Sequence, residues 1–465
     1  MQLVLLVAVV AALVIAEYSP GQPVPDGGYR LAMAVAAVAA VALCAAAGSL
    51  LTARRLESDF PRRHVLLRRF RRLRQVHLVL WLAAAGFISY GLQWGQLVRF
   101  NWRLDHVFLV DDVLILAPVL APLVLSWAAF YEVERAVHRL VAGEDPGGAD
   151  PPARWAYVAT HLRFHLGVLL VPVLAMLAVQ DAAEIFLPAA RGNDSQYTAV
   201  LVGPAVLLLL VLFPCLVRYV WDTQPLAPGP LRDRLEGAAR RAGLRVREIL
   251  VWRTGGMVVN AAVAGFLPRL RYVFLTDGLL AQLSEEQIEA VFGHEAGHVR
   301  HRHLVLRVLA MLTPLSFWIL LEQIYPEAAA AAAGWLGTGD AGSQVRGGLM
   351  ILAVMAVYVL LVFGAYSRML EGQADLFGCR ALAADRSTPP VETFISALEK
   401  LAIAGGIDRN APSWQHASIA RRISFLHRVA SDPRYEESFQ RRLRWVGSLI
   451  IAVVVSPLAY FFLVG

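Results

Sequence analysis

Long apolar runs separated by shorter polar stretches dominate this chain of 465 residues. Eight of the runs approach the length of about 20 residues that a helix needs to cross a bilayer. They are 31–51, 76–98, 107–130, 164–180, 200–221, 304–324, 349–366 and 446–464. A ninth run, 1–16, is apolar but shorter, and it lacks the basic head and small-residue cleavage pattern of a secretory signal. We predict that it is a further membrane anchor.

Two longer polar segments interrupt this pattern, 222–303 and 367–444, and together they are large enough for one small domain. The pattern therefore predicts five parts. They are N-terminal membrane helices (1–221), the first part of the polar domain (222–303), two membrane helices (304–366), its second part (367–444) and a C-terminal membrane helix (445–465).

The first polar segment mixes short strands with helices. A Pro/Gly linker at 225–230 precedes a predicted helix at 231–242, which ends at Gly243. Alternating apolar positions then predict strands at 246–252, 258–265 and 271–275. Ser284 and Gln287 are spaced as a capping box, which predicts that a second helix begins there.

Composition supports the membrane interpretation. Hydrophobic residues make up 57% of the chain and charged residues 17%, and the mean hydropathy is +0.54. These values lie far from those of soluble globular domains, so an ordinary soluble protein is excluded.

The positions of the basic residues predict the orientation in the membrane. If run 1–16 spans, all but five of the 43 Lys and Arg residues fall on one side. The positive-inside rule places that side, with both polar segments, in the cytoplasm. Nine arginines lie between Arg54 and Arg74, and we interpret them as facing anionic lipid rather than nucleic acid.

Only Lys400 is a lysine, and this bias toward arginine is typical of a GC-rich bacterium. We therefore expect a multi-pass protein of a bacterial cytoplasmic membrane.

The pentad His294-Glu295-Ala296-Gly297-His298 carries the chemistry. On a helix, His294 and His298 project from one face and can place two imidazole nitrogens on one Zn²⁺. Glu295 stands beside the first histidine, where it can accept a proton from water activated by the metal. The pattern predicts a catalytic zinc site that binds one Zn²⁺ per chain.

A third zinc ligand must come from elsewhere, and Glu371 is the candidate. The chain crosses the membrane twice between His298 and Glu371, so the two residues emerge on the same side. Asp375 shares a helical face with Glu371 and is better placed to orient a ligand histidine than to bind metal. His301 and His303, which follow the pentad among arginines, are interpreted as part of a basic collar at the membrane boundary.

Four blocks resemble the membrane-integrated zinc metallopeptidases that include the CAAX prenyl endoproteases and the HtpX-type stress proteases. They are the strand motif Asn260 to Gly265, the HExxH pentad, the SRxxExxAD pattern from Ser367 to Asp375, and His416-Ala417-Ser418 with Arg422-Ile423. Ala417 replaces a proline of the family pattern. The extra membrane runs also leave open whether the spans enclose an internal chamber.

The resemblance implies zinc ligation by His294, His298 and Glu371, with Glu295 as the general base. It also implies that His416 and Arg422 steady the oxyanion formed at the peptide carbonyl.

Substrate binding is predicted at the strand before the zinc helix. The residues that would pair with an extended substrate are Asn260, Ala261, Ala262, Val263 and Ala264. A polypeptide, in particular a membrane protein, is the expected partner, together with the lipid bilayer. The oligomeric state stays open.

The predicted fold class is mainly α, a polytopic α-helical membrane bundle with a cytoplasmic α+β zincin-type metalloprotease domain. The predicted function is a zinc metalloendopeptidase that cuts membrane proteins at the cytoplasmic face, as proteolytic quality control. Two alternatives stay open: a zinc-binding membrane sensor of the antirepressor type, and a CAAX-type processing protease.

Overall fold

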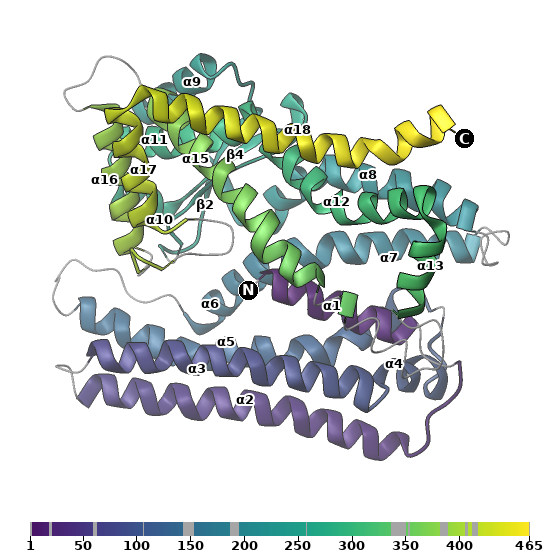
Figure 1. Ribbon diagram of the computed structural model, residues 1–465. Coiled ribbons are helices and arrows are strands. Elements are labelled where there is room, and N and C mark those ends of the chain that lie inside the picture. The colour runs from purple at the N-terminus through teal and green to yellow at the C-terminus, as the bar shows by residue number, and fades with distance from the viewer. Residues whose placement is uncertain are drawn as a thin grey trace. The chain divides into compact units, whose positions relative to one another are not determined.

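The computed structural model describes residues 2–17, 21–58, 63–105, 107–142, 153–186, 195–256, 258–335, 350–351, 354–381, 389–404, 408–411 and 417–464. The chain divides into two compact units, unit 1 (Met1–Trp221) and unit 2 (Asp222–Gly465). Figure 1 shows that long helices make up most of each unit.

Every regular element in the described residues of unit 1 is a helix. Its elements are α1 (Gln2–Glu17), α2 (Gly27–Ser58), α3 (Arg63–Gly86), η2 (Phe87–Gly91), α4 (Trp94–Gln96), η3 (Leu97–Asn101), α5 (Val110–Ala142), α6 (Arg154–His161), η4 (Leu162–Gly167), α7 (Val168–Phe186) and α8 (Ser195–Val220).

Seven helices of the described chain are long and apolar enough to cross a membrane. They are Gly27–Ser58, Val65–Gly91, Val110–Val137, Arg154–Ala183, His303–Ile324, Val354–Arg380 and Pro433–Leu463. A bent pair, Gly203–Leu209 and Val211–Val220, could form an eighth span, and its 50° bend falls in α8, which contains Pro204 and Pro214. Each of the eight apolar runs predicted to span overlaps one of these helices. The 16 residues of α1 extend only about 24 Å, which is short of a bilayer core of about 30 Å.

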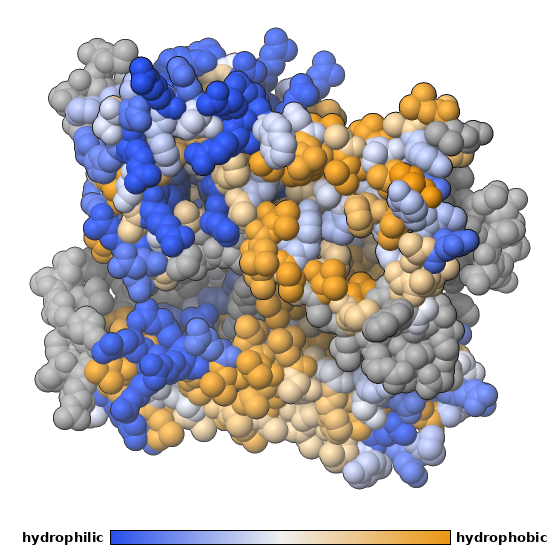
Figure 2. Space-filling view, in the orientation of Figure 1, coloured by the Kyte–Doolittle hydropathy of each residue, from blue (hydrophilic) through white to orange (hydrophobic). Residues whose placement is uncertain are grey.

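Within unit 1, polar groups are concentrated at the helix ends. Arg99 donates hydrogen bonds to Asp111 and Glu17, both at 2.9 Å. Figure 2 shows hydrophilic residues at both ends of the α2 and α3 pair and hydrophobic residues between them. This distribution is the one expected of spanning helices.

Unit 2 contains a four-stranded sheet with the order β1-β2-β4-β3. Its strands are β1 (Thr223–Pro225), β2 (Glu248–Trp252), β3 (Ala261–Ala264) and β4 (Tyr272–Thr276). β2 runs parallel to β4, whereas β1 and β3 pair antiparallel with β2 and β4 respectively. β3 is therefore an edge strand. In its register Ala262 pairs with Phe274, and Asn260 accepts a hydrogen bond from the amide of Thr276 just before the strand.

The helical elements of unit 2 surround the sheet and continue into the spans. They are α9 (Pro230–Arg241), η6 (Pro268–Leu270), α10 (Asp277–Gln282), α11 (Glu285–Arg300), α12 (His303–Ile324), α13 (Pro326–Trp335), η7 (Val359–Phe363), α15 (Gly364–Ala381), α16 (Pro390–Ala404), α17 (Ile419–Ser431) and α18 (Pro433–Val464).

One apolar core joins the sheet to α9, α10 and α11, and a second joins α11 to α12, α15, α16, α17 and α18. α11 contributes to both cores, and ten of its residues are buried. Glu289 of α11 is fully buried and pairs with Arg234 and Arg241 of α9. The helix that carries the pentad is thus fixed from several sides.

The predicted fold class of a helical membrane bundle with a small α+β domain is confirmed. Two details differ from the sequence prediction. β2 and β3 begin two to three residues later than predicted. The first residue of the predicted Pro/Gly linker, Pro225, instead ends β1, a strand of three residues. Pro225 is tolerated because β1 lies at the sheet edge.

Candidate metal centre

The pentad lies on α11, whose start is fixed by the predicted capping box. Ser284 accepts a hydrogen bond from the amide of Gln287 at 3.4 Å, and Gln287 accepts one from the amide of Ser284 at 3.0 Å. Glu285 and Glu286 in the first turn complement the positive end of the helix dipole. The pentad follows in the third turn, within a regular helix that orients both histidines alike.

Two glycines let α11 and α15 approach closely enough to share a site. A Cβ on Gly297 would lie 3.1 Å from the Cα of Ala374, and one on Gly378 would lie 3.0 Å from the backbone nitrogen of His294. Real Cβ atoms rarely approach other atoms so closely, so any larger residue would separate the two helices. These contacts place Glu371, on α15, opposite the histidine pair.

Three potential ligand side chains converge between α11 and α15. Nε2 of His294 lies 3.2 Å from Nε2 of His298 and 3.6 Å from Oε2 of Glu371, and Nε2 of His298 lies 3.5 Å from Oε1 of Glu371. Ligands at about 2.0 to 2.2 Å from a tetrahedral Zn²⁺ are separated by about 3.3 to 3.6 Å. The two imidazoles and the carboxylate therefore suit a zinc ion in both chemistry and spacing, with a fourth position left for water.

Asp375 and Arg422 orient His294 through the Nδ1 side of its ring. Oδ1 of Asp375 lies 2.8 Å from Nδ1 of His294, so the Nδ1–H can donate to the carboxylate while Nε2 keeps its lone pair. Arg422 of α17 donates to both oxygens of Asp375, from Nε at 2.9 Å and Nη2 at 2.5 Å. Asp375 is fully buried, so this bidentate pair compensates its charge.

His303 orients the second ligand. Its Nδ1 lies 2.8 Å from Nδ1 of His298, and its Nε2 lies 2.9 Å from Oε1 of Gln373. Gln373 in turn donates from Nε2 to Oε1 of Gln440 at 2.8 Å, which fixes the amide so that its oxygen faces His303. His303 must then donate from Nε2 and accept at Nδ1, so His298 donates from Nδ1 and presents the lone pair of Nε2 to the ligand cluster.

His303 therefore has a different environment from the predicted basic collar. It is fully buried and bonded to a candidate ligand, while His301 stacks on its ring with centroids 5.7 Å apart. Helical periodicity could not identify His303, because Arg302 adopts a left-handed conformation with φ of 55° and separates α11 from α12. The spacing after the pentad is the only sequence signal that could have indicated it.

Charge and burial affect the candidate ligands differently. Burial lowers the pKa of His294, but the hydrogen bond and charge of Asp375 outweigh this and raise the pKa above its usual value. Burial, with the neighbouring His294, lowers the pKa of His298 to about 2. His298 is thus neutral at physiological pH, as metal binding requires. Arg307 of α12 donates to Oε1 of Glu371 at 2.6 Å and balances its charge.

The remaining predicted site residues lie as follows. Glu295 is half-buried on α11 next to His294. Arg422 contacts Asp375, as described above. His416 lies outside the described residues. Asn260 to Ala264 lie on or just before β3, and β3 packs against α11.

Part of this chain is similar to a known peptidase family and to known proteases. Residues 225–430 match the family described as "Peptidase family M48". The chain is 27% identical over 199 residues to the "Protease HtpX homolog" of Aeropyrum pernix, covering 42% of this chain and 61% of that protein. It is 26% identical over 179 residues to the "Protease HtpX" of Cronobacter sakazakii, covering 37% of this chain and 57% of that protein. These matches span less than two thirds of the relatives' own length.

The chain also aligns with a solved structure. The crystal structure of S. mikatae Ste24p aligns with a TM-score of 0.44 and 16% identity, over 87% of this chain and all of that chain. The family match and the HtpX relatives confirm the resemblance to membrane-integrated metallopeptidases that the sequence blocks predicted.

Proposed function

We propose that this chain, whose residues 225–430 match peptidase family M48, is a zinc-dependent endopeptidase that hydrolyses membrane proteins. The observation that carries the proposal is the cluster of His294, His298 and Glu371, in which the nearest nitrogen and oxygen atoms of each pair of side chains lie 3.2 to 3.6 Å apart. One open coordination position makes such a set suited to catalysis rather than to a structural role.

Different side chains serve different steps of peptide hydrolysis. Zinc held by the two histidines and Glu371 would act as a Lewis acid and make water nucleophilic near neutral pH. Glu295 takes the proton released by the attacking water and delivers it to the amine that leaves. Asp375 keeps His294 in the tautomer that presents Nε2, and His303 does the same for His298. Arg422 is bound to Asp375, which supports a positioning role, and His416 remains the proposed oxyanion donor.

The open edge of β3 is the proposed substrate site. Because β3 pairs only with β4 among the described strands, its outer edge can accept an extended peptide. Asn260 pairs with Thr276, so alternation along the antiparallel ladder directs the backbone groups of Ala261 and Val263 outward. β3 also packs against α11, which supports delivery of a bound peptide toward the pentad.

We place this site at the cytoplasmic face of a bacterial membrane. The bias of arginines toward the loops that share a side with 222–303 and 367–444 supports the placement. The substrates we expect are damaged membrane proteins, which fits quality control. The sensor and the CAAX-type processing enzyme are the alternatives.

Comparison of the wild type with Glu295→Gln tests the proposal. Both proteins would be purified in detergent for zinc analysis and expressed in cells for mapping of membrane-protein fragments. We expect equal zinc in the two proteins and fragments only with the wild type. Identical fragment patterns would favour the sensor. If the variant lost its zinc, the experiment would not separate proton transfer by Glu295 from an effect of Glu295 on metal binding.

A further inference from the structure

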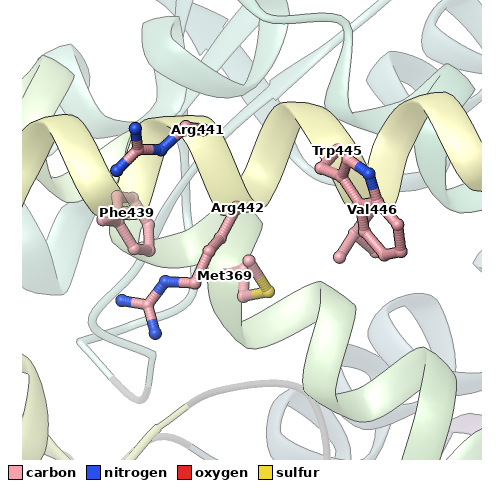
Figure 3. A pocket seen from close by; sticks show the side chains of 6 residues that line it. All are labelled: Met369, Phe439, Arg441, Arg442, Trp445 and Val446. Atoms are coloured by element: carbon pink, nitrogen blue, oxygen red, sulfur yellow. The ribbon is translucent and has the colours of Figure 1, made fainter.

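An apolar groove lies on unit 2 between α15 and the first half of α18. Its volume is about 570 Å³, and it is lined by Met369, Phe439, Arg441, Arg442, Trp445 and Val446. Figure 3 shows Arg442 extending on the same side of α18 as Met369, with Trp445 and Val446 farther along the helix and Arg441 on the other side. The groove therefore has a basic end and an apolar end.

The groove lies where the sequence of α18 changes from charged to apolar residues. Charged residues recur up to Arg444, and none follows in the remainder of the helix. Trp445, at the boundary, is 69% exposed, and Leu449, Val455 and Phe462 beyond it are also exposed. In Figure 2 the surface around the start of α18 is hydrophilic and its later part is hydrophobic. Tryptophan and arginine at such a boundary are typical of the membrane–water interface.

The two arginines of the groove have no acidic partner among the described residues. Both are exposed, and neither forms a hydrogen bond or ion pair with another described residue. Other arginines nearby are paired, as Arg380 is with Glu436 and Arg422 with Asp375. A guanidinium presents a fork of donors that matches phosphate oxygens. The groove thus combines uncompensated positive charge with an adjacent apolar wall.

The floor of the groove adjoins the metal centre. Met369 lies two residues before Glu371 on α15. Gln440, which lies between Phe439 and Arg441, accepts the hydrogen bond of Gln373, and Gln373 contacts His303 next to His298. The contact between α18 and α15 in the groove therefore continues through hydrogen bonds to a candidate ligand.

We propose that this groove binds one anionic phospholipid. Its phosphate contacts Arg442, with Arg441 at the rim, and an acyl chain lies along Met369, Trp445 and Val446. The bound lipid holds α18 against α15 and so stabilises the hydrogen-bonded support of His298. The effect on His298 rests on the zinc site of the proposed function, whereas lipid binding does not, and both are measured without peptide hydrolysis.

The test uses the full chain in nanodiscs of phosphatidylcholine with or without phosphatidylglycerol. Lipid retained by the protein is measured by native mass spectrometry, and zinc affinity by competition with a chelator. The variant is Arg442→Gln. The matched control is Arg434→Gln, which removes the same charge from an exposed position on the same helix outside the groove.

We expect the wild type and Arg434→Gln to retain phosphatidylglycerol in preference to phosphatidylcholine, and Arg442→Gln to lose about fivefold of that preference. Phosphatidylglycerol should also raise zinc affinity in the first two proteins but not in Arg442→Gln. Equal preference in all three proteins would overturn the proposal, as would equal loss in both variants. Displacement of the lipid by inorganic phosphate would show that the groove binds free phosphate instead. Failure of the peptidase assay would leave both readouts unaffected.

Discussion

Nδ1 of His303 lies 2.8 Å from Nδ1 of His298, and this contact selects the tautomer of a candidate zinc ligand. His303 is itself fixed by Gln373, so the ligand is oriented by residues of α12, α15 and α18 together. Residues that orient metal ligands often matter nearly as much as the ligands themselves.

His303→Ala should therefore weaken zinc binding by about 10- to 100-fold, because His298 loses its hydrogen-bond acceptor. Chelator competition measures the effect. His301→Ala is the matched control, since His301 stacks on His303, whereas the hydrogen bond to His298 comes from His303. An equal loss in both variants would show that the ring stack, and not the hydrogen bond, supports the site.

Arg422→Met should destabilise unit 2 by about 3 to 5 kcal/mol, because it leaves the buried carboxylate of Asp375 without its cation. The double variant Arg422→Met with Asp375→Leu should recover part of this loss, since the unpaired charge is gone. Thermal unfolding in detergent compares the variants. If Arg422→Met unfolds at the wild-type temperature, the ion pair contributes nothing to stability.

Gly378→Ala should lower both stability and zinc affinity. The added methyl would lie 3.0 Å from the backbone nitrogen of His294 and 2.9 Å from the ring of Phe394, so α15 must move away from α11. Such overpacking costs about 1 to 3 kcal/mol. Gly334→Ala on α13 is the control, since its methyl would meet no atom within 4 Å. Normal zinc affinity in Gly378→Ala would mean that the helices adapt without disturbing the ligands.

Val263→Pro should abolish peptide hydrolysis while leaving zinc binding intact. The alternation of β3 directs the amide of Val263 outward, so proline removes a donor to the substrate without breaking a bond to β4. Fragment analysis and zinc content are the two measurements, with Val263→Ala as the control for the lost side chain. Undiminished hydrolysis by the proline variant would exclude β3 as the substrate edge.

The predictable parts of this protein are those encoded by local or strongly periodic signals. Apolar runs of about 20 residues identified the candidate spans, and the capping box at Ser284 identified the start of α11. Glu371 does meet the histidines, as the even number of predicted crossings allows, and α15 continues the helix of a candidate span.

Contacts between distant segments were not predictable in the same way. The bond from Gln373 to Gln440 joins helices far apart in the sequence, and no periodicity relates them. β1 is too short to give an alternating pattern, and it ends in a proline. His303 follows the left-handed residue Arg302, where the helical register of the pentad no longer applies.

The separation of Glu371 from the pentad also has a consequence for biosynthesis. During translation His294 and His298 emerge first, while Glu371 follows only after α12 and most of the helix at Val354–Arg380 have been made. A nascent chain therefore holds an incomplete ligand set until both of those helices can be inserted and packed. For the peptidase proposed above, insertion of these two helices would therefore also be the step that completes the metal site, so peptide hydrolysis would begin only after insertion.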